Sequence, residues 1–161
     1  TTSTLQQAAN RRLGLSAKKT MSVAQQLYEG VSVGRSLTGL ITYMRTDSVR
    51  LASEAVQSIR AYVEANFGSE YIPAKANVFS TSKSAQDAHE AIRPTDVNRT
   101  PESVAAYLSS DQLKLYTLIW SRTVQSQMSD AVYDTTVLII GANGYELKAS
   151  GQVLKFPGYL A

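Results

Sequence analysis

A change of sequence pattern near its end most constrains what this chain can fold into. Up to Met128, apolar residues recur at helical spacing, whereas Thr135–Ile140 and Tyr145–Ala149 are rich in residues that favour strands. These two runs flank Asn143-Gly144, a pair that favours a tight hairpin turn. The sequence therefore predicts a mainly α (α+β) fold, with helices first and a β-hairpin last.

The β-rich end is predicted to belong to a different domain from the helices. Gln152–Phe156 is a candidate third strand. Because a sheet of two or three strands is marginal by itself, residues 131–161 are expected to be the truncated start of a neighbouring β-rich domain. Residues 1–130 would form a helical domain. Exposed strand edges can also pair with a second chain, so a dimer of this fragment is a further expectation.

Glycine and hydroxyl residues mark the ends of the predicted helices. The first helix should end at Gly14, and the second should be capped by Ser16 and end at Gly30. A third should run from about Ala52 to Gly68, with Ser48 or Ser53 as its cap because Ala52 has no hydroxyl. Further helices should begin at Thr100-Pro101 and near Ser110. The last should bury Leu113, Tyr116, Trp120, Val124 and Met128, with Trp120 a packing residue.

Two stretches between the helices are predicted to be irregular. Residues 30–39 contain three glycines among serines and valines, and are expected to form a flexible loop. They lead into a short strand over Leu40–Met44. Residues 74–85, rich in serine, lysine and alanine, are expected to be a linker.

The strand-like run ends at Tyr43, two residues before Arg45. A tyrosine phenol has an ordinary pKa of about 10, so at neutral pH it is almost entirely protonated and a weak nucleophile. An arginine within about 4–6 Å favours the phenolate and can donate to a phosphate oxygen. Tyr43 is therefore a candidate nucleophile, although a half-buried strand tyrosine followed by a surface arginine has the same pattern.

The only histidine in the chain, His89, lies in the charged segment Gln86–Asp96. This segment also holds Arg93, three carboxylates and Pro94, which stops any helix. Opposite charges crowded in this way suit oriented contacts to phosphate groups. A lone histidine is more often a surface residue, so the segment gains meaning only beside Tyr43.

Together, three stretches resemble the tyrosine-bearing domain of bacterial type IA DNA topoisomerases. They are Tyr43–Ser48 (YMRTDS), Ala88–Asp96 (AHEAIRPTD) and the opening Thr1–Gln7 (TTSTLQQ). Their order and approximate spacing also agree, and the resemblance runs through nearly all of the chain. Two separated motifs of this length are far more specific than one short pattern.

The resemblance implies an ATP-independent enzyme that cleaves and rejoins single-stranded DNA through a 5′-phosphotyrosine intermediate and so relaxes negative supercoils. Tyr43 would be the nucleophile, Arg45 would stabilise the phenolate or the phosphate charge, and His89 would hydrogen-bond the phosphate or order the network around Tyr43. The residues expected to orient these groups or contact phosphate are Asp47, Arg93 and Thr95.

The resemblance also implies that the intact enzyme uses Mg²⁺ bound by a separate Toprim domain. That domain lies outside these residues and no Asp-x-Asp pair occurs here, so we expect no metal site and no bound cofactor in this chain. The fragment alone should bind single-stranded DNA weakly and should not relax supercoiled DNA. Its expected partners are single-stranded and negatively supercoiled DNA and the remaining domains of the same enzyme.

Basic residues are concentrated in the first 50 residues, where seven against two acidic residues give a net charge of +5; the other 111 residues carry −2. The pairs Arg11-Arg12 and Lys18-Lys19 suit phosphate contacts, although a solvated helix face is equally basic. The Gly14–Ser16 turn between them resembles a helix-turn-helix. A non-enzymatic DNA-binding module is therefore the alternative function, and a structural interaction domain with Tyr43 in its core is a third.

Composition excludes several other classes of protein. With 43% hydrophobic and 18% charged residues, the chain should fold rather than remain disordered. No apolar run approaches the roughly 20 residues needed to span a bilayer, so we expect no membrane partner and a cytoplasmic, nucleoid-associated location. The absence of cysteine excludes disulfides and thiolate metal sites, and one histidine cannot form a zinc-binding cluster.

Overall fold

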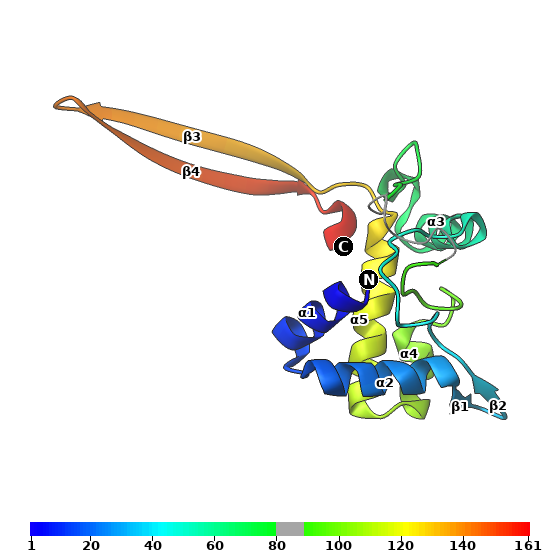
Figure 1. Ribbon diagram of the computed structural model, residues 1–161. Helices are drawn as coiled ribbons and strands as arrows, with labels where there is room; N and C mark the ends of the chain where they lie inside the picture. The colour runs from blue at the N-terminus through cyan, green and yellow to red at the C-terminus, as the bar shows by residue number, and fades with distance from the viewer. Residues whose placement is uncertain (80–88) are drawn as a thin grey trace.

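Helices form the body of the molecule and a long hairpin forms its end (Figure 1). The computed structural model describes residues 1–79 and 89–161. Part of the predicted linker and the first residues of the segment around His89, including Asp87 and Ala88, lie outside these ranges. The α-helices and strands are α1 Thr2–Leu13, α2 Ala17–Glu29, β1 Val31–Val33, β2 Ser36–Thr38, α3 Ser53–Phe67, α4 Pro101–Val104, α5 Ser110–Ser126, β3 Val132–Ala142 and β4 Tyr145–Phe156.

The helix boundaries confirm most of the predicted capping signals. Gly14 ends α1 in the left-handed conformation at φ 68°, and the Ser16 side chain accepts a hydrogen bond from the backbone N–H of Lys19. Thr100 caps α4 with Pro101 in its first turn, and Ser109 forms a capping box for α5. In the described ranges, no helix has the length and apolar character needed to cross a membrane.

The cap predicted for α3 was wrong. Ala52 is the N-cap residue, and neither Ser48 nor Ser53 forms a capping hydrogen bond with the first turn of the helix. The Ser48 hydroxyl accepts from the N–H of Arg50 in the preceding turn. The carboxylate of Glu90 instead accepts from the N–H of Ala52 at 2.6 Å. A distant acidic side chain therefore supports the helix start, where the helix dipole favours negative charge.

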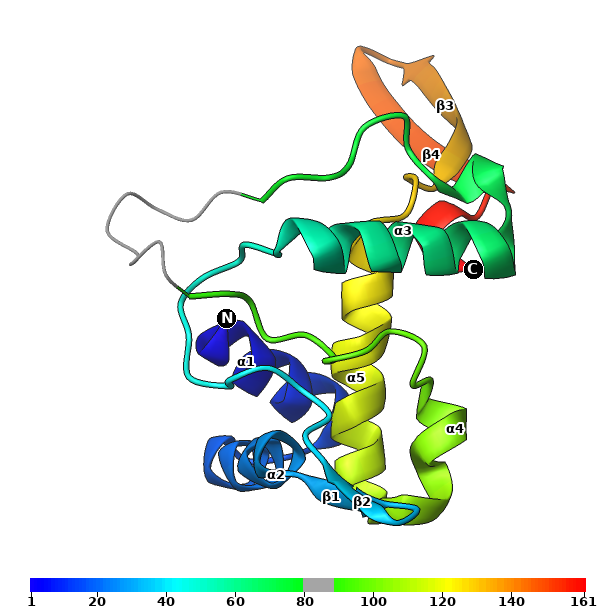
Figure 2. The same cartoon turned by 90° about the vertical axis from the view of Figure 1, so that its right-hand side faces the viewer.

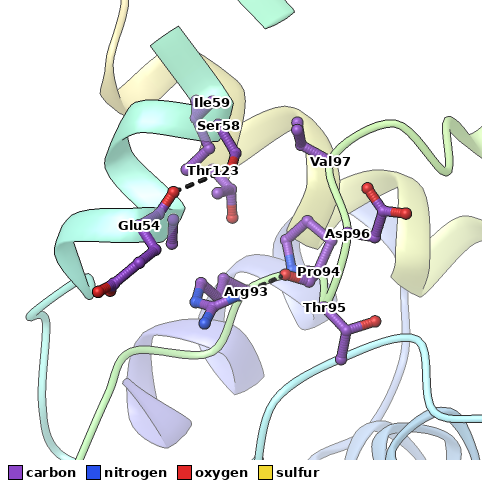
Figure 3. A pocket seen from close by; sticks show the side chains of 10 residues that line it. Glu54, Ser58, Ile59, Arg93, Pro94, Thr95, Asp96, Val97 and Thr123 are labelled. Carbon is purple, nitrogen blue, oxygen red and sulfur yellow. Dashed lines mark hydrogen bonds between the residues drawn. The ribbon is translucent and has the colours of Figure 1, made fainter. Parts of the chain in front are cut away.

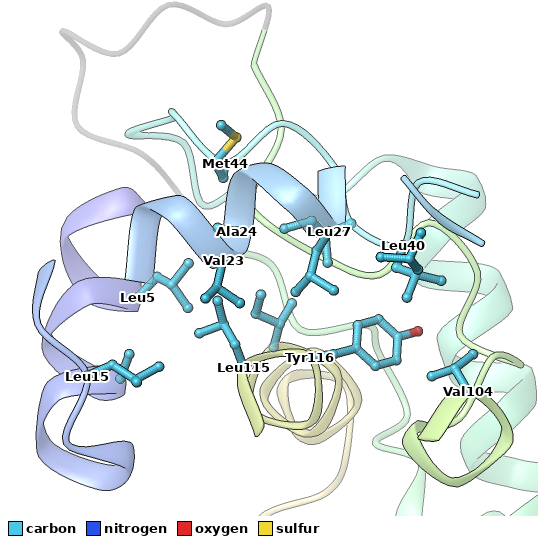
Figure 4. Close-up of a cluster of buried hydrophobic side chains, with 14 residues drawn as sticks. Leu5, Leu15, Val23, Ala24, Leu27, Leu40, Met44, Val104, Leu115 and Tyr116 are labelled. Carbon is cyan, nitrogen blue, oxygen red and sulfur yellow. The ribbon is translucent and has the colours of Figure 1, made fainter. Parts of the chain in front are cut away.

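Helix α5 runs through the middle of the helical body, with α1 and α2 on one side and α3 on the other (Figures 1 and 2). Leu115 and Tyr116 are fully buried against α2 and the segment that carries Tyr43 (Figure 4). The buried apolar residues form two clusters, one between α5 and α1–α2 and the other between α5 and α3. Trp120 packs against both clusters and donates from Nε1 to the Val97 carbonyl at 2.8 Å, as expected for a packing residue. Burial raises the pKa of Tyr116, whose hydroxyl donates to the Arg99 carbonyl at 2.6 Å.

Two irregular stretches differ from their prediction. Residues 31–38 form a small antiparallel hairpin rather than a flexible loop, since Gly34 supplies the turn at φ 64° and Val31 is buried in the core. The stretch Leu40–Met44 is extended, but only Ile41 forms a β-bridge, with Pro94. Beyond it, the Thr42 hydroxyl accepts from the Arg93 N–H and donates to the Ala91 carbonyl, so a side chain takes the place of further backbone pairing.

The β3–β4 hairpin projects from the helical body (Figure 1). Its turn confirms the Asn-Gly signal, with Asn143 at φ 49° and Gly144 at φ 80°. The predicted third strand is wrong, because Gly151 pairs with Thr136 and β4 continues unbroken to Phe156. Phe156 then packs on Tyr71, with ring centroids 4.9 Å apart, so the base of the hairpin is attached to the helical body.

Candidate active site

The segment that carries Tyr43 is fixed at its backbone while its phenol is open to solvent. The N–H of Leu40 donates to the Leu27 carbonyl at the end of α2, at 2.8 Å. Ile41 and Met44, on either side of the tyrosine, are each 1% exposed, whereas Tyr43 is 48% exposed. This exposure excludes the reading in which Tyr43 is a core residue.

The segment around His89 is hydrogen-bonded to the Tyr43 segment. The N–H of Thr42 donates to the Arg93 carbonyl at 2.9 Å, and the Thr42 hydroxyl donates to the Ala91 carbonyl at 2.9 Å. On the other side of Tyr43 in sequence, the Ala91 N–H donates to the Arg50 carbonyl at 2.8 Å. The two motifs, about 50 residues apart in the chain, therefore lie side by side.

The opening threonine run joins the same assembly through Thr2. Its hydroxyl donates to the Met44 carbonyl at 2.8 Å and accepts from the N–H of Thr46 at 2.9 Å. The backbone N–H of Thr2 also donates to the Thr46 carbonyl at 2.8 Å. The first turn of α1 thus holds both ends of the peptide that contains Arg45.

Burial alternates along the turn that follows Tyr43. Met44, Thr46 and Ser48 are buried, and the Thr46 hydroxyl accepts from the N–H of Ser48 at 3.0 Å. The intervening Arg45 and Asp47 are exposed, as Tyr43 is. Because alternate residues of an extended segment point to opposite sides, the phenol, the guanidinium and the carboxylate are directed toward solvent while the hydroxyls fix the backbone.

His89 is exposed, and the residues that follow it are tied down by Glu90. One Glu90 oxygen receives the Ala52 N–H, and the other accepts from Arg93 Nη2 at 2.9 Å. Arg93 also donates from Nη1 to the Pro94 carbonyl at 3.0 Å, so its guanidinium is already engaged within its own segment. Arg93 is thus paired with Glu90, and its orienting role stays a prediction.

A shallow pocket of about 190 Å³ lies between the start of α3 and the segment after Arg93 (Figure 3). The side chains of Glu54, Arg93 and Asp96 lie around it. Thr95, predicted to contact phosphate, is exposed and donates from its hydroxyl to the Gly39 carbonyl at 2.8 Å, which helps to fix the start of the Tyr43 segment. Across residues 1–79 and 89–161, no group of three or more acidic or histidine side chains gathers in one place.

The four basic residues predicted to contact phosphate lie around the α1–α2 turn. Arg11 and Arg12 occupy the last turn of α1, and Lys18 and Lys19 the first turn of α2; all four are exposed. Lys19 pairs with Asp111 at 3.0 Å. Because Thr2 at the start of α1 bonds the Tyr43 segment, Arg11 and Arg12 lie roughly 15 Å along the helix from that contact.

Comparison with known proteins agrees with this arrangement. The family model described as DNA topoisomerase matches residues 1–161. The chain belongs to the DNA topoisomerase family. The resemblance to bacterial type IA topoisomerases drawn from the motifs is thereby confirmed.

The topoisomerase chain is 52% identical to DNA topoisomerase 1 of Campylobacter jejuni, over 98% of its own length and 23% of that protein. It is 48% identical to DNA topoisomerase 1 of Helicobacter pylori strain J99, over 98% of its length and 22% of that protein. The solved structure of full-length topoisomerase I from Thermotoga maritima matches with a TM-score of 0.82 at 45% identity, over 98% of this chain and 25% of that one. The chain therefore spans about a quarter of these relatives.

Three residues of this topoisomerase site were missed or misread in the sequence. Thr2 was given no role of its own within the opening stretch Thr1–Gln7, and Glu90 was only one of three carboxylates in its segment. No role in the site was predicted for Tyr28, yet its ring lies against that of Tyr43 with centroids 5.3 Å apart. Each acts through a contact with a residue far along the chain, and local periodicity carries no signal of such contacts.

Proposed function

We propose that this chain supplies the nucleophilic tyrosine of a type IA DNA topoisomerase, with Tyr43 as the attacking residue and single-stranded DNA as the substrate. One observation carries the proposal: an exposed tyrosine lies on a backbone that three separate motifs hold in place. A solvent-exposed phenol on a rigid segment suits attack on a phosphate within a long polymer. Membership of the DNA topoisomerase family supports the same chemistry.

The reaction is a transesterification. The Tyr43 oxygen bonds to phosphorus as the bond from phosphorus to the 3′-oxygen breaks, which leaves a 5′-phosphotyrosine and a free 3′-hydroxyl. The phenol gives up one proton and the leaving oxygen gains one, so no oxidant, reductant or nucleotide is consumed. Another DNA strand passes through the gap before the reverse reaction reseals it, and the linking number changes without ATP.

Arg45 and His89 are the proposed partners of Tyr43 in this chain. Arg45 follows Tyr43 at the next exposed position, where its guanidinium can neutralise charge on the phenolate or on the phosphate oxygens. His89 would hydrogen-bond the phosphate from the neighbouring segment. Asp47 would help to orient these groups, and Arg93 would do so through its ion pair with Glu90.

The remaining catalytic groups are proposed to lie outside this chain. Mg²⁺ would be bound by acidic residues of a Toprim domain and would supply charge neutralisation at the phosphate. We propose that residues 1–130 form the tyrosine-bearing domain and that the hairpin begins a β-rich neighbour, because its strand residues other than Phe156 are exposed. The chain alone would then bind single-stranded DNA in a salt-dependent way and leave supercoiled DNA unrelaxed.

A non-enzymatic helix-turn-helix module is the second candidate, and one observation favours it. The α1–α2 turn gathers Arg11, Arg12, Lys18 and Lys19 on exposed helix ends, which suits contacts to a phosphate backbone. This reading leaves the joined Tyr43 and His89 segments without a purpose. Under our proposal the basic cluster contacts the same DNA away from the cleaved bond.

The proposal is tested with a suicide oligonucleotide that traps the covalent adduct in the full-length enzyme carrying this chain. Tyr43→Phe should lower adduct formation at least about a thousandfold, because the nucleophilic oxygen is lost. Tyr107→Phe is a matched control, since Tyr107 is 47% exposed and Tyr43 48%. Full adduct yield from Tyr43→Phe would contradict the proposal. A wild-type enzyme that binds the oligonucleotide but forms no covalent adduct would favour the binding module.

A further inference from the structure

Tyr28 places an aromatic ring against the proposed nucleophile. The rings of Tyr28 and Tyr43 meet edge to face, with centroids 5.3 Å apart and an interplanar angle of 66°. This is a favoured geometry for aromatic pairs. Among the residues that the structure describes, Tyr28 is the one aromatic residue whose ring pairs with that of Tyr43.

The backbones that carry the two rings are fixed to each other. Tyr28 lies in the last turn of α2, where its neighbour Leu27 is fully buried and accepts a hydrogen bond from the Leu40 N–H at 2.8 Å. A Cβ added at Gly39 would lie 2.7 Å from the Tyr28 carbonyl oxygen, so the two segments approach as closely as glycine permits. The backbone that carries the Tyr28 ring is therefore fixed by the core.

The Tyr43 side chain likewise extends into solvent from a fixed backbone. A half-exposed tyrosine can move among staggered rotamers in solution, whereas attack on phosphorus needs the phenol oxygen in line with the leaving oxygen. The Tyr28 ring occupies space beside the Tyr43 ring and favours the rotamer in which their edge-to-face contact forms. The ring, and not its hydroxyl, makes this contact.

We infer that Tyr28 is a positioning residue that holds Tyr43 in its attacking rotamer. This inference rests on the proposed function, since it concerns the orientation of the same nucleophile. Tyr28 itself is 41% exposed and makes no bond to the reacting phosphate in this role. Its effect should therefore appear in the rate of the chemical step and not in the affinity for DNA.

The test uses the full-length enzyme and measures single-turnover adduct formation at saturating suicide oligonucleotide. Tyr28→Ala and Tyr28→Leu should each lower the rate about threefold to tenfold, as loss of one aromatic pair predicts. Tyr28→Phe keeps the ring and should restore the rate to within about twofold of wild type. Tyr107→Ala, at a tyrosine of similar exposure, should have no effect.

Affinity for the same oligonucleotide is measured in a Tyr43→Phe background, where no adduct forms. Tyr28→Ala should leave this affinity within about twofold, because a positioning residue acts on rate alone. Two results would overturn the inference: an unchanged rate in both ring-deleting variants, or a loss confined to affinity, which would make Tyr28 a base-stacking contact. An absence of Tyr43-linked adduct in the wild-type enzyme would instead overturn the proposed function.

Discussion

The Tyr43 site and the β3–β4 hairpin are built from opposite kinds of contact. Around Tyr43, side chains hydrogen-bond to backbone groups 38 to 51 residues away, as Thr2, Thr42 and Glu90 do. In the hairpin, β3 pairs with β4 across a two-residue turn, and the strand residues other than Phe156 are exposed. The first region is held by the whole helical body, and the second by its own turn and its attached base.

The difference shows that long-range contacts fix the backbone around Tyr43, whereas the hairpin has few contacts outside itself. Under the proposed function, the nucleophile needs a fixed backbone beneath a free side chain, and buried hydroxyls and carbonyls supply this. The hairpin carries apolar residues on both faces, including Leu138 and Ile139, at 54% and 61% exposure. Such a ribbon is typical of a surface that other parts of a longer protein cover.

The largest expected effect comes from emptying the core beneath Tyr43. Leu40→Ala should lower the free energy of unfolding by about 2–5 kcal/mol, because Leu40 is fully buried and its loss leaves a cavity. Leu138→Ala is the matched control on the hairpin and should change the free energy of unfolding by less than about 0.5 kcal/mol. Urea denaturation of the 161-residue chain measures both. Equal losses would show that the two regions are not held as differently as their contacts indicate.

Glu90 provides a smaller test of the long-range contacts. Glu90→Ala removes the acceptor for the Ala52 N–H and the ion-pair partner of Arg93, both partly buried, and should cost about 1.5–3 kcal/mol. Glu90→Gln keeps one acceptor oxygen and should recover part of this loss. Urea denaturation is again the measurement, and hydrogen exchange should show the loss of protection first at the start of α3. Wild-type stability in Glu90→Ala would mean that this carboxylate does not join the segments.

The smallest effect concerns pH. Burial raises the pKa of Tyr116 above that of a tyrosine in the unfolded chain, so the folded state holds this proton more tightly. The corresponding stability is complete below about pH 10 and is lost as pH rises further. Tyr116→Phe should cost about 0.5–1.5 kcal/mol at neutral pH, through the lost bond to the Arg99 carbonyl, and should flatten the alkaline decline. An equally steep decline in the variant would assign it to other groups.

Local signals were enough to predict the hairpin turn and most helix ends. Asn143-Gly144, Ser16 and Thr100 act on backbone groups within a few residues, so their effect can be judged from neighbouring sequence. The same local reasoning failed over Gln152–Phe156, which was expected to be a third strand although cross-strand pairing continues through Gly151. It also failed over residues 31–38, where glycine and serine suggested a loop and burial of Val31 favours a hairpin.

The site was predictable only in part. The motifs around Tyr43 and His89 named the residues, and the structure joins their segments through Thr42. The supporting contacts could not be derived, because Glu90 reaches Ala52 and Tyr28 reaches Tyr43 only after the chain has folded. A sequence pattern identifies groups with suitable chemistry, whereas their positions depend on packing between distant elements.

The most direct test of the central claim is to locate the DNA attachment by mass spectrometry. The trapped adduct of the full-length enzyme is digested with nuclease and protease, and the nucleotide-bearing peptide is sequenced. With nine tyrosines in this chain, the assignment is demanding. Our account predicts a nucleotide joined through its 5′-phosphate to the oxygen of Tyr43. Attachment to Tyr28, to any other residue, or through a 3′-phosphate would contradict it.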